Sequence, residues 1–180
     1  MNISVVNDLV IRGASLQSIL DASSGANAIL PPTNTPLLNF LTMKRRFDDV
    51  LTLVARGADI NIRSVNGVTP LKVSLIRGDV DFSQKLILRH AEFNPSDKWN
   101  ELCFALNSGK EKAVNFVLKS TSNDIFSENT FLIAIHRNNY DFTKNNLMKY
   151  RGDINALKAK LLKRLAGKKA HMDLVTDILK

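Results

Sequence analysis

One stretch, residues 57–71, constrains the fold more than any other part of the chain. It reads Gly-Ala-Asp-Ile-Asn-Ile-Arg-Ser-Val-Asn-Gly-Val-Thr-Pro-Leu and follows an apolar helical run. Gly57 suits the left-handed residue that ends many helices, and Asn66-Gly67 is a strong signal for a tight hairpin turn. Thr69 can cap the next helix, with Pro70 at the first helical position, where its missing N–H costs nothing. The stretch predicts a helix, a left-handed stop, a hairpin finger and a second, capped helix.

The same pattern recurs along the chain. Thr69-Pro70-Leu71-Lys72 follows Thr35-Pro36-Leu37-Leu38 after 34 residues, and further helix starts at Asn100 and Thr130 follow after 31 and 30 residues. Such a period, with a helix-turn-helix unit in each copy, indicates a repeat array, whose units are stable because they stack on their neighbours. The turns expected inside the units are Arg77-Gly78-Asp79, Asn107-Ser108-Gly109 and Asn138-Asn139.

These units resemble ankyrin repeats over about residues 35–180. The resemblance implies an all-α ankyrin-repeat solenoid of roughly five stacked helix pairs with short β-hairpin fingers. The motifs are strong in the first two full repeats and degenerate later: Glu101 and Phe131 replace the proline, His90 replaces the helix-ending glycine, and that glycine is also lost near Thr121. A non-glycine residue in a left-handed conformation costs on the order of 1 kcal/mol, so we expect the later fingers to deviate more than the helices.

The resemblance divides the chain into three parts. Residues 1–34 read as a degenerate N-terminal capping half-repeat, with a helix over 2–13 and a short helix from Leu16. Because Pro31-Pro32 cannot lie inside a helix, an irregular loop over 22–34 is expected in place of the first finger. Residues 35–156 hold the ankyrin repeats. Residues 157–180 form a C-terminal capping repeat, with a turn at Ala166-Gly167 and a final helix from His171.

Composition excludes several classes of protein. The single cysteine among 180 residues excludes an internal disulfide framework and fits a reducing compartment, so a cytoplasmic location is expected. The first 20 residues lack the features of a secretory signal, and no apolar run approaches the roughly 20 residues of a membrane span. The net charge of +8 permits acidic partners.

No set of side chains indicates catalysis or metal binding. Cys103 lies among apolar neighbours and reads as a core residue, while His90, His136 and His171 lack the spacing of metal ligands. Asp48-Asp49 fits a helix start, where carboxylates meet the positive end of the helix dipole. There is no glycine-rich phosphate loop. We expect a protein that is not an enzyme and holds neither a metal nor a cofactor.

In ankyrin proteins the finger tips and the exposed positions of the first helices form a concave binding face. Trp99, the one tryptophan, stands just before a first helix. Tryptophan is enriched among residues that dominate binding energy, although a degenerate finger folded over Trp99 would bury it. The partner-binding residues that the resemblance implies are Val65, Asn66, Val68, Ile76, Arg77, Asp97, Trp99, Asn107, Ser108, Arg137 and Asn138.

Basic residues gather toward the C-terminus. Between residues 144 and 169 the cations are opposed by Asp153 alone, and Lys160, Lys163 and Arg164 share a helix face opposite an apolar stripe. This basic patch is either the solvated outer face of a cap or a dock for an acidic protein, phosphoinositide or nucleic acid. Residues 158–169 contain no aromatic residue, which disfavours single-stranded nucleic acid as the ligand, because such strands bind by stacking. The patch consists of Lys158, Lys160, Lys163, Arg164, Lys168 and Lys169.

The sequence therefore predicts a protein-interaction scaffold or adaptor that acts as a monomer through its concave face. Its degenerate repeats also resemble those of ankyrin proteins from intracellular bacteria and large viruses. That likeness implies a host-directed effector, delivered into a host cell if the source is bacterial. The alternative function is binding of acidic lipid headgroups or nucleic acid through the basic patch.

Overall fold

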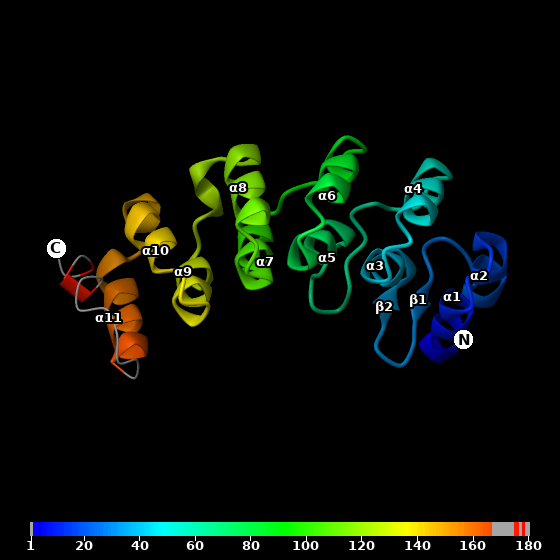
Figure 1. Cartoon of the computed structure of the whole chain (residues 1–180), viewed down its shortest axis with the longest axis horizontal. Coiled ribbons are helices and arrows are strands. Elements are labelled where there is room, and N and C mark those ends of the chain that lie inside the picture. The colour runs from blue at the N-terminus through cyan, green and yellow to red at the C-terminus, as the bar shows by residue number, and fades with distance from the viewer. Residues whose placement is uncertain (1, 167–174, 177, 179–180) are drawn as a thin grey trace. The chain divides into compact units, whose positions relative to one another are not determined.

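The structure is a computed structural model that describes residues 2–166, 175, 176 and 178 (Figure 1). It divides into two compact units, unit 1 (Met1–Glu92) and unit 2 (Phe93–Lys180). Both are built from short helices that pack in pairs. Within the described residues, no helix combines the length and the hydropathy needed to cross a membrane.

Unit 1 contains three helix pairs among its described residues. Its elements are α1 (Ile3–Ile11), α2 (Leu16–Ser23), β1 (Ile29–Leu30), β2 (Thr35–Pro36), α3 (Leu37–Met43), α4 (Phe47–Ala55), α5 (Pro70–Arg77) and α6 (Val80–Ile87). The helices pair in chain order, α1 with α2, α3 with α4 and α5 with α6. The first helices α3 and α5 lie side by side, and α4 and α6, which pack on them, form a second row above them in the view of Figure 1.

The junction between α4 and α5 confirms the prediction from residues 57–71. Gly57 is left-handed, with φ of +90°, and the Thr69 hydroxyl accepts the N–H of Lys72 at 3.3 Å to cap α5. The turn itself is one residue longer than a two-residue Asn-Gly turn. The N–H of Gly67 donates to the Ser64 carbonyl at 2.9 Å, and Gly67 then takes a left-handed φ of +70°. This is the three-residue hairpin loop, in which the glycine follows the turn.

The first finger corrects the prediction of an irregular loop over residues 22–34. Strands β1 and β2 pair antiparallel, with Leu30 opposite Thr35. Pro31-Pro32 lies at the tip of this hairpin, where a proline does not have to donate a ladder hydrogen bond. The prolines exclude a helix, as predicted, but they do not exclude a hairpin.

The N-terminal helices form a complete pair where a half-repeat was expected. Gly13, with φ of +71°, is followed by Ala14, whose N–H donates to the Leu9 carbonyl at 2.9 Å. This is the bonding of the turn inside the α5–α6 pair, where the N–H of Asp79 donates to the Ser74 carbonyl at 2.9 Å. Because α2 follows directly and packs on α1, Arg12-Gly13 connects two packed helices and does not precede a finger.

Unit 2 contains two helix pairs and one further first helix among its described residues. Its elements are α7 (Glu101–Ser108), α8 (Glu111–Ser120), η1 (Asn123–Ile125), α9 (Glu128–His136), α10 (Tyr140–Asn146), η2 (Leu147–Lys149) and α11 (Ile154–Leu165). Helix α9 packs between α7 and α11 in one row, while α8 packs on α7 and α10 packs on α9 (Figure 1). The predicted final helix from His171 lies mainly outside the described residues, as does Gly167 of the predicted turn.

The start of α9 was predicted three residues too late. Ser127, not Thr130, caps the helix: the Ser127 hydroxyl accepts the N–H of Thr130 at 3.4 Å, and the Thr130 hydroxyl accepts the N–H of Ser127 at 3.2 Å. This reciprocal capping box satisfies two amide donors at once. The capping box was not predicted, because Thr130 was aligned with the Thr-Pro helix start of an earlier repeat.

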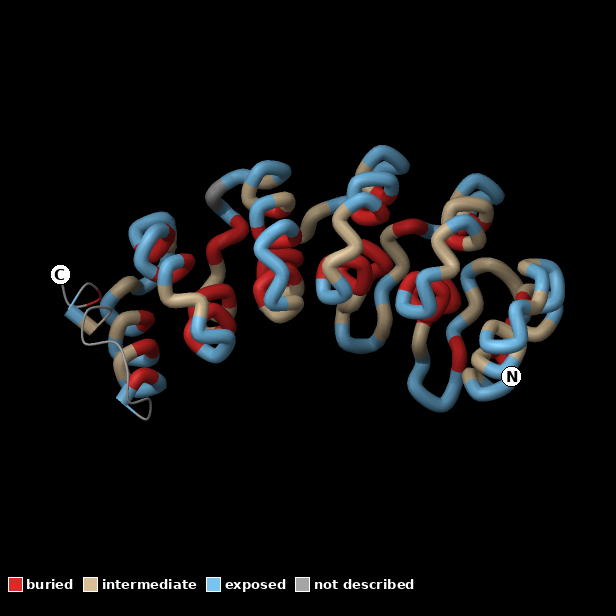
Figure 2. The backbone as a smooth tube through the Cα atoms, viewed as in Figure 1, coloured by how far each residue is buried: buried red, intermediate tan, exposed pale blue. Residues whose placement is uncertain are grey.

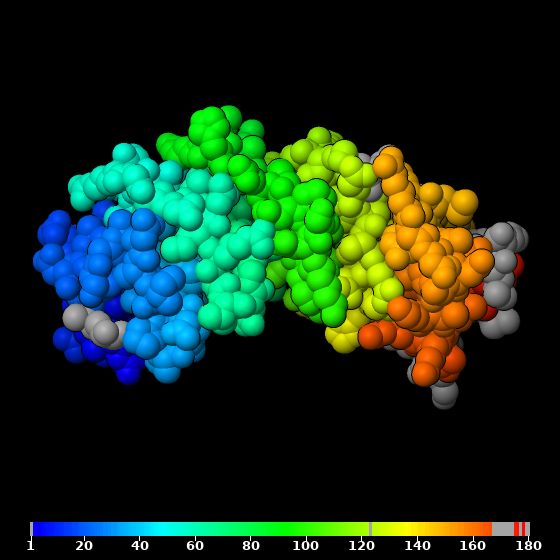
Figure 3. Space-filling view, turned by 180° about the vertical axis from the view of Figure 1, so that it is seen from behind, coloured from blue at the N-terminus to red at the C-terminus, as the bar shows by residue number. Residues whose placement is uncertain are grey.

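Apolar side chains fill the space between the two rows of each unit. Buried residues concentrate where the rows face each other (Figure 2), and the space-filling view shows side chains closing the gaps between ribbons (Figure 3). In unit 1 the rings of Phe47 and Phe82 stack 4.0 Å apart. In unit 2 the ring of Phe131 lies about 6 Å from those of Phe126 and Phe142. Each such burial contributes about 1.5–3 kcal/mol before entropy is subtracted.

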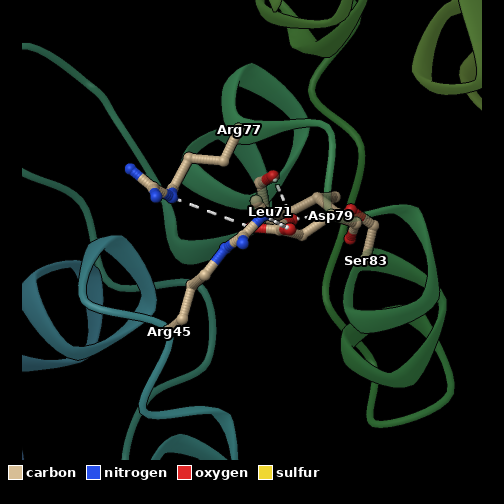
Figure 4. Close-up of polar contacts among 6 residues, drawn as sticks. Arg45, Leu71, Arg77, Asp79 and Ser83 are labelled. Carbon is tan, nitrogen blue, oxygen red and sulfur yellow. Dashed lines mark hydrogen bonds and ion pairs between the residues drawn. The ribbon is translucent and has the colours of Figure 1, made fainter. Parts of the chain in front are cut away.

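Polar side chains tie neighbouring repeats together. Arg45, in the turn of the α3–α4 pair, donates to both carboxylate oxygens of Asp79 in the turn of the next pair (Figure 4). Arg77 approaches the same carboxylate, with Nε 3.7 Å from Oδ2. The Asn61 amide bridges two fingers: its Nδ2 donates to the His90 carbonyl at 3.2 Å, and its Oδ1 accepts the N–H of Glu92 at 2.9 Å. These contacts fix the spacing between the stacked pairs of unit 1.

Candidate functional site

Corresponding positions on the first helices remain open to a partner. A left-handed residue follows the first helix in all five described pairs: it is Gly13 after α1, and in the pairs from α3 onward it is Arg45, Gly78, Gly109 and Asn138. The residues two positions earlier are Met43, Ile76, Asn107 and His136, and all of them are exposed or half-buried. In an α-helix, the residues three and four positions before them lie on the same face. On α7 and α9 this face therefore includes Cys103 and Phe104, and Leu132 and Ile133.

In unit 2 these faces line a hollow of about 480 Å³, which we call the groove. Its floor comes from α7 and α9, its rim from the finger before α7, and one wall residue from α11. The lining residues are Lys98, Trp99, Cys103, Phe104, Asn107, Asn129, Leu132, Ile133, His136 and Arg164. This volume lies within the range of about 300–1,000 Å³ that is typical of ligand-binding pockets.

Trp99 stands at the rim of the groove with half of its surface (50%) exposed. The backbone around it is held on both sides. Asn129 of α9 donates from Nδ2 to the Lys98 carbonyl at 2.8 Å, and Asn100 donates to the Ile125 carbonyl at 2.8 Å. Of the two alternatives that the sequence left open, the structure shows the exposed tryptophan.

Cys103 closes part of the floor and is buried, as the sequence predicted. Its Sγ lies 3.7 Å from the Thr130 hydroxyl and 3.8 Å from the Ser127 hydroxyl, both at the start of α9. A thiol becomes a nucleophile when nearby cations lower its pKa and reagents can reach it. With two hydroxyl groups as its polar neighbours, Cys103 serves as a small core residue between α7 and α9.

Among the residues that the structure describes, the titratable side chains that line the groove include basic residues and no carboxylate. Lys98 on the finger, His136 at the end of α9 and Arg164 on α11 are exposed basic residues, and the described residues that line the groove include no aspartate or glutamate. Glu128, in the first turn of α9, accepts a hydrogen bond from Lys160 at 2.7 Å. That bond raises the pKa of Lys160. The carboxylate of Glu128 therefore already has a cationic partner.

Several of the predicted partner-binding residues of unit 2 have structural contacts. Arg137 donates from Nε to Asn107 Oδ1 at 3.0 Å, which clips the end of α9 to the end of α7. The Ser108 hydroxyl accepts the N–H of Lys110 at 3.0 Å. Arg137 and Asn138 line a second hollow of about 560 Å³ on the α8 and α10 side, away from Trp99. Of the predicted set, the structure brings Trp99 and Asn107 into the groove.

The predicted residues of unit 1 form a separate surface. Val65 is 73% exposed at the finger tip beside exposed Asn66, and Val68 is half-buried. Ile76 is 37% exposed near the end of α5, and Arg77 next to it approaches Asp79. Their role in binding stays a prediction.

The residues of the basic patch differ in their exposure and in their neighbours. Leu157, Leu161 and Leu165 are buried, which confirms the predicted apolar stripe of α11. Lys158 is half-buried, Lys163 is exposed, and Lys168 and Lys169 lie outside the described residues. Arg164 belongs to the groove as much as to the patch, a role that sequence reasoning missed.

Sequence reasoning also missed the groove floor. None of Phe104, Leu132, Ile133 and His136 is among the predicted partner-binding residues, although all four line the groove. A usable signal was present, because these residues stand five, six or two positions before the left-handed turns at Gly109 and Asn138. Phe40, the counterpart of Phe104 in unit 1, is buried, whereas Phe104 is half-buried, so position alone does not reveal a groove.

No protein-family model matches the sequence, and no curated protein matches it. Among solved structures, the human ASB11 ankyrin repeat domain is similar, with a TM-score of 0.45 and 17% sequence identity over 79% of this chain and 82% of that chain. The arrangement described above, with paired helices, left-handed stops and connecting fingers, is an ankyrin-repeat fold. This assignment rests on the local geometry of the helix pairs, since the overall likeness is low.

Proposed function

We propose that this ankyrin-repeat protein is a non-enzymatic interaction module and that the groove of unit 2 is its main binding surface. Ankyrin repeats generally bind other proteins. The observation that carries the proposal is the half-exposed Trp99, whose neighbouring backbone is fixed by Asn100 and Asn129. A tryptophan held in place before binding loses little conformational freedom when a partner docks, so more of its contact energy appears as affinity.

The groove floor supports the same conclusion. Phe104 and Leu132 are half-buried, so part of each side chain faces the hollow and is available to an apolar anchor of the partner. Interfaces of this kind place an apolar centre inside a polar rim. Lys98 and Arg164 provide such a rim here.

Unit 1 offers a second contact surface at Val65 and Ile76, and we propose that a large partner uses it in addition to the groove. The scaffold or adaptor role, monomeric state and cytoplasmic location belong to the same proposal. The host-directed effector role rests on the family resemblance alone.

The test compares four forms of the full chain as bait in affinity capture from a cell lysate at moderate salt. They are the wild type, Trp99→Ala, Leu132→Asp and the control Met148→Ala, whose side chain is 86% exposed outside the groove. Circular dichroism checks that each variant is folded. Replacing a tryptophan at the centre of an interface with alanine typically reduces the binding free energy by about 2 kcal/mol or more, which corresponds to about a thirtyfold change in Kd. Isothermal titration with the purified partner should therefore show that loss for Trp99→Ala and no change for Met148→Ala.

Other outcomes separate the alternatives. A partner that is retained by Trp99→Ala but lost by Val65→Asp would move the binding surface to unit 1. Recovery of anionic lipid or nucleic acid alone, lost after Lys163→Glu and at high salt, would favour the alternative function of the basic patch.

A further inference from the structure

We propose that the groove binds an acidic segment of a partner protein, in which an apolar anchor residue is flanked by aspartate or glutamate. This inference rests on the proposed function and specifies the chemistry of the partner. It combines two features of the groove, its apolar floor and its ring of basic side chains.

The apolar part of the groove calls for an anchor residue. Phe104 and Leu132 face the hollow beside Ile133. Trp99 lies at one edge of the hollow, where half of its surface is exposed. A leucine, isoleucine or phenylalanine placed on this floor would lose its contact with water on several sides. Burial of such a side chain is the main source of affinity in a small groove.

The rim selects acidic neighbours for that anchor. Lys98, His136 and Arg164 come from three different elements, the finger, α9 and α11, and surround the floor with positive charge or the capacity for it. A partner cation would meet the positive charges of Lys98 and Arg164 from two different elements, and the described lining offers no carboxylate to compensate them. The groove therefore disfavours basic segments as well as favouring acidic ones.

Arg164 is the residue most suited to a specific contact. It is exposed on α11, one turn after Lys160, whose ammonium group is paired with Glu128. A guanidinium group binds a carboxylate through two parallel hydrogen bonds and is less strongly hydrated than an ammonium group. Arg164 can thus fix the orientation of the segment as well as attract it.

The contacts already made around the groove preserve this charge. Lys160 pairs with Glu128 on the α9 side, so the carboxylate next to the groove residue Asn129 is already neutralised by a cation. The chain as a whole carries a net charge of +8, which steers acidic partners toward it from a distance.

A displayed library of short random peptides, panned against the full chain, tests the inference without a known partner. The enriched sequences are read, and the consensus peptide is synthesised with a fluorescent label. Its Kd is measured by fluorescence anisotropy for the wild type and the variants. The matched control for Arg164→Glu is Lys119→Glu, which makes the same charge change on an exposed residue of α8.

We expect a consensus of an apolar residue with aspartate or glutamate close to it. Arg164→Glu should weaken the labelled peptide about tenfold and Trp99→Ala at least as much, while Lys119→Glu and Met148→Ala change the Kd less than about twofold. Replacing the acidic residues of the peptide with glutamine should weaken its binding to the wild type but have little further effect on its binding to Arg164→Glu. Raising the salt concentration should weaken peptide binding more for the wild type than for Arg164→Glu, because salt screens exposed charges.

The failure of this inference can be told apart from failure of the proposed function. Peptides that depend on Trp99 but show no acidic preference, or that bind equally well after Arg164→Glu, would overturn the inference and leave the groove as a binding site. Peptides lost by Val65→Asp but not by Trp99→Ala would overturn it and move the interaction to unit 1. If no peptide is enriched, while phosphatidylserine–phosphatidylcholine vesicles bind wild type and Trp99→Ala alike, both the inference and the groove proposal would be refuted.

Discussion

His90 ends α6 in a left-handed conformation, and we predict that His90→Gly stabilises unit 1. The residue has φ of +68° and is exposed. Its backbone already makes the contacts of a regular helix stop. The N–H donates to the Ile87 carbonyl at 2.9 Å, and the carbonyl accepts Asn61 Nδ2 at 3.2 Å. These bonds do not involve the imidazole, so glycine can keep them all.

Two opposing terms set the size of the effect. A left-handed conformation costs a residue that carries a Cβ about 1–2 kcal/mol, and glycine removes this strain. Glycine also gives the unfolded chain more freedom, which costs about 0.5–1 kcal/mol on folding. The difference predicts a net gain of about 0.5–1 kcal/mol for His90→Gly.

Two control variants isolate the backbone conformation. Leu88→Gly changes a residue that is 72% exposed, with φ of −60° in the right-handed region, so only the entropic cost applies and a loss of about 0.5–1 kcal/mol is expected. Gly57→Ala introduces a Cβ at φ of +90° that would meet no atom within 4 Å, so strain without a clash opposes the smaller entropic gain and a net loss of about 0.5–1 kcal/mol is expected.

Urea unfolding of the full chain, followed by far-UV circular dichroism, measures the three variants. With a slope of about 1–3 kcal/mol per molar urea, the midpoint for His90→Gly should rise by about 0.3 M and those of both controls should fall. Fluorescence of Trp99 reports unit 2 separately, because a repeat array need not unfold in one step. A midpoint for His90→Gly that is unchanged or lower, with both controls behaving as expected, would refute the strain argument.

Three further predictions concern single contacts. Asn39→Ala should cost about 0.5–1.5 kcal/mol in urea unfolding, because Asn39 Nδ2 donates to the Val68 carbonyl at 2.8 Å; an unchanged midpoint would show that this bond does not stabilise the finger. Phe82→Ala should cost about 3–5 kcal/mol, because Phe82 is buried and stacks on a ring of α4; a loss below about 1 kcal/mol would contradict the packing. Glu128→Gln should lower the pKa of Lys160, followed by NMR titration of its side chain, whereas an unchanged pKa would refute the ion pair.

Local signals predicted the fold because each helix pair is specified by its own residues. The Thr69 hydroxyl caps a helix whose first residue is Pro70, and Gly57 stops one by its left-handed conformation, so both were read correctly from sequence. Errors arose where two local devices compete. Ser127 and Thr130 both suit a cap, and the reciprocal bond between them decided in favour of Ser127. Pro31-Pro32 excludes a helix but permits either a loop or a hairpin tip, and pairing of the adjacent strands decided for the hairpin.

The candidate site was much less accessible to sequence reasoning. Trp99 was singled out by its residue type, but its exposure depends on how Asn129, thirty residues later, holds the backbone of Lys98. Arg164 was grouped with its sequence neighbours on α11. Packing of α9 between α7 and α11 places it instead on the groove that contains Trp99.

The sequence by itself determined the repeat, its period, the helix stops and the net positive charge, because these depend on residues within one turn or one finger of each other. Only the tertiary structure decided which first-helix side chains remain open and which cations gather around them. Phe40 and Phe104 occupy equivalent positions, yet Phe40 is buried and Phe104 is half-buried. The physical reason is that burial is a property of all the neighbours in space. A residue's own position in the repeat fixes only the direction in which its side chain points.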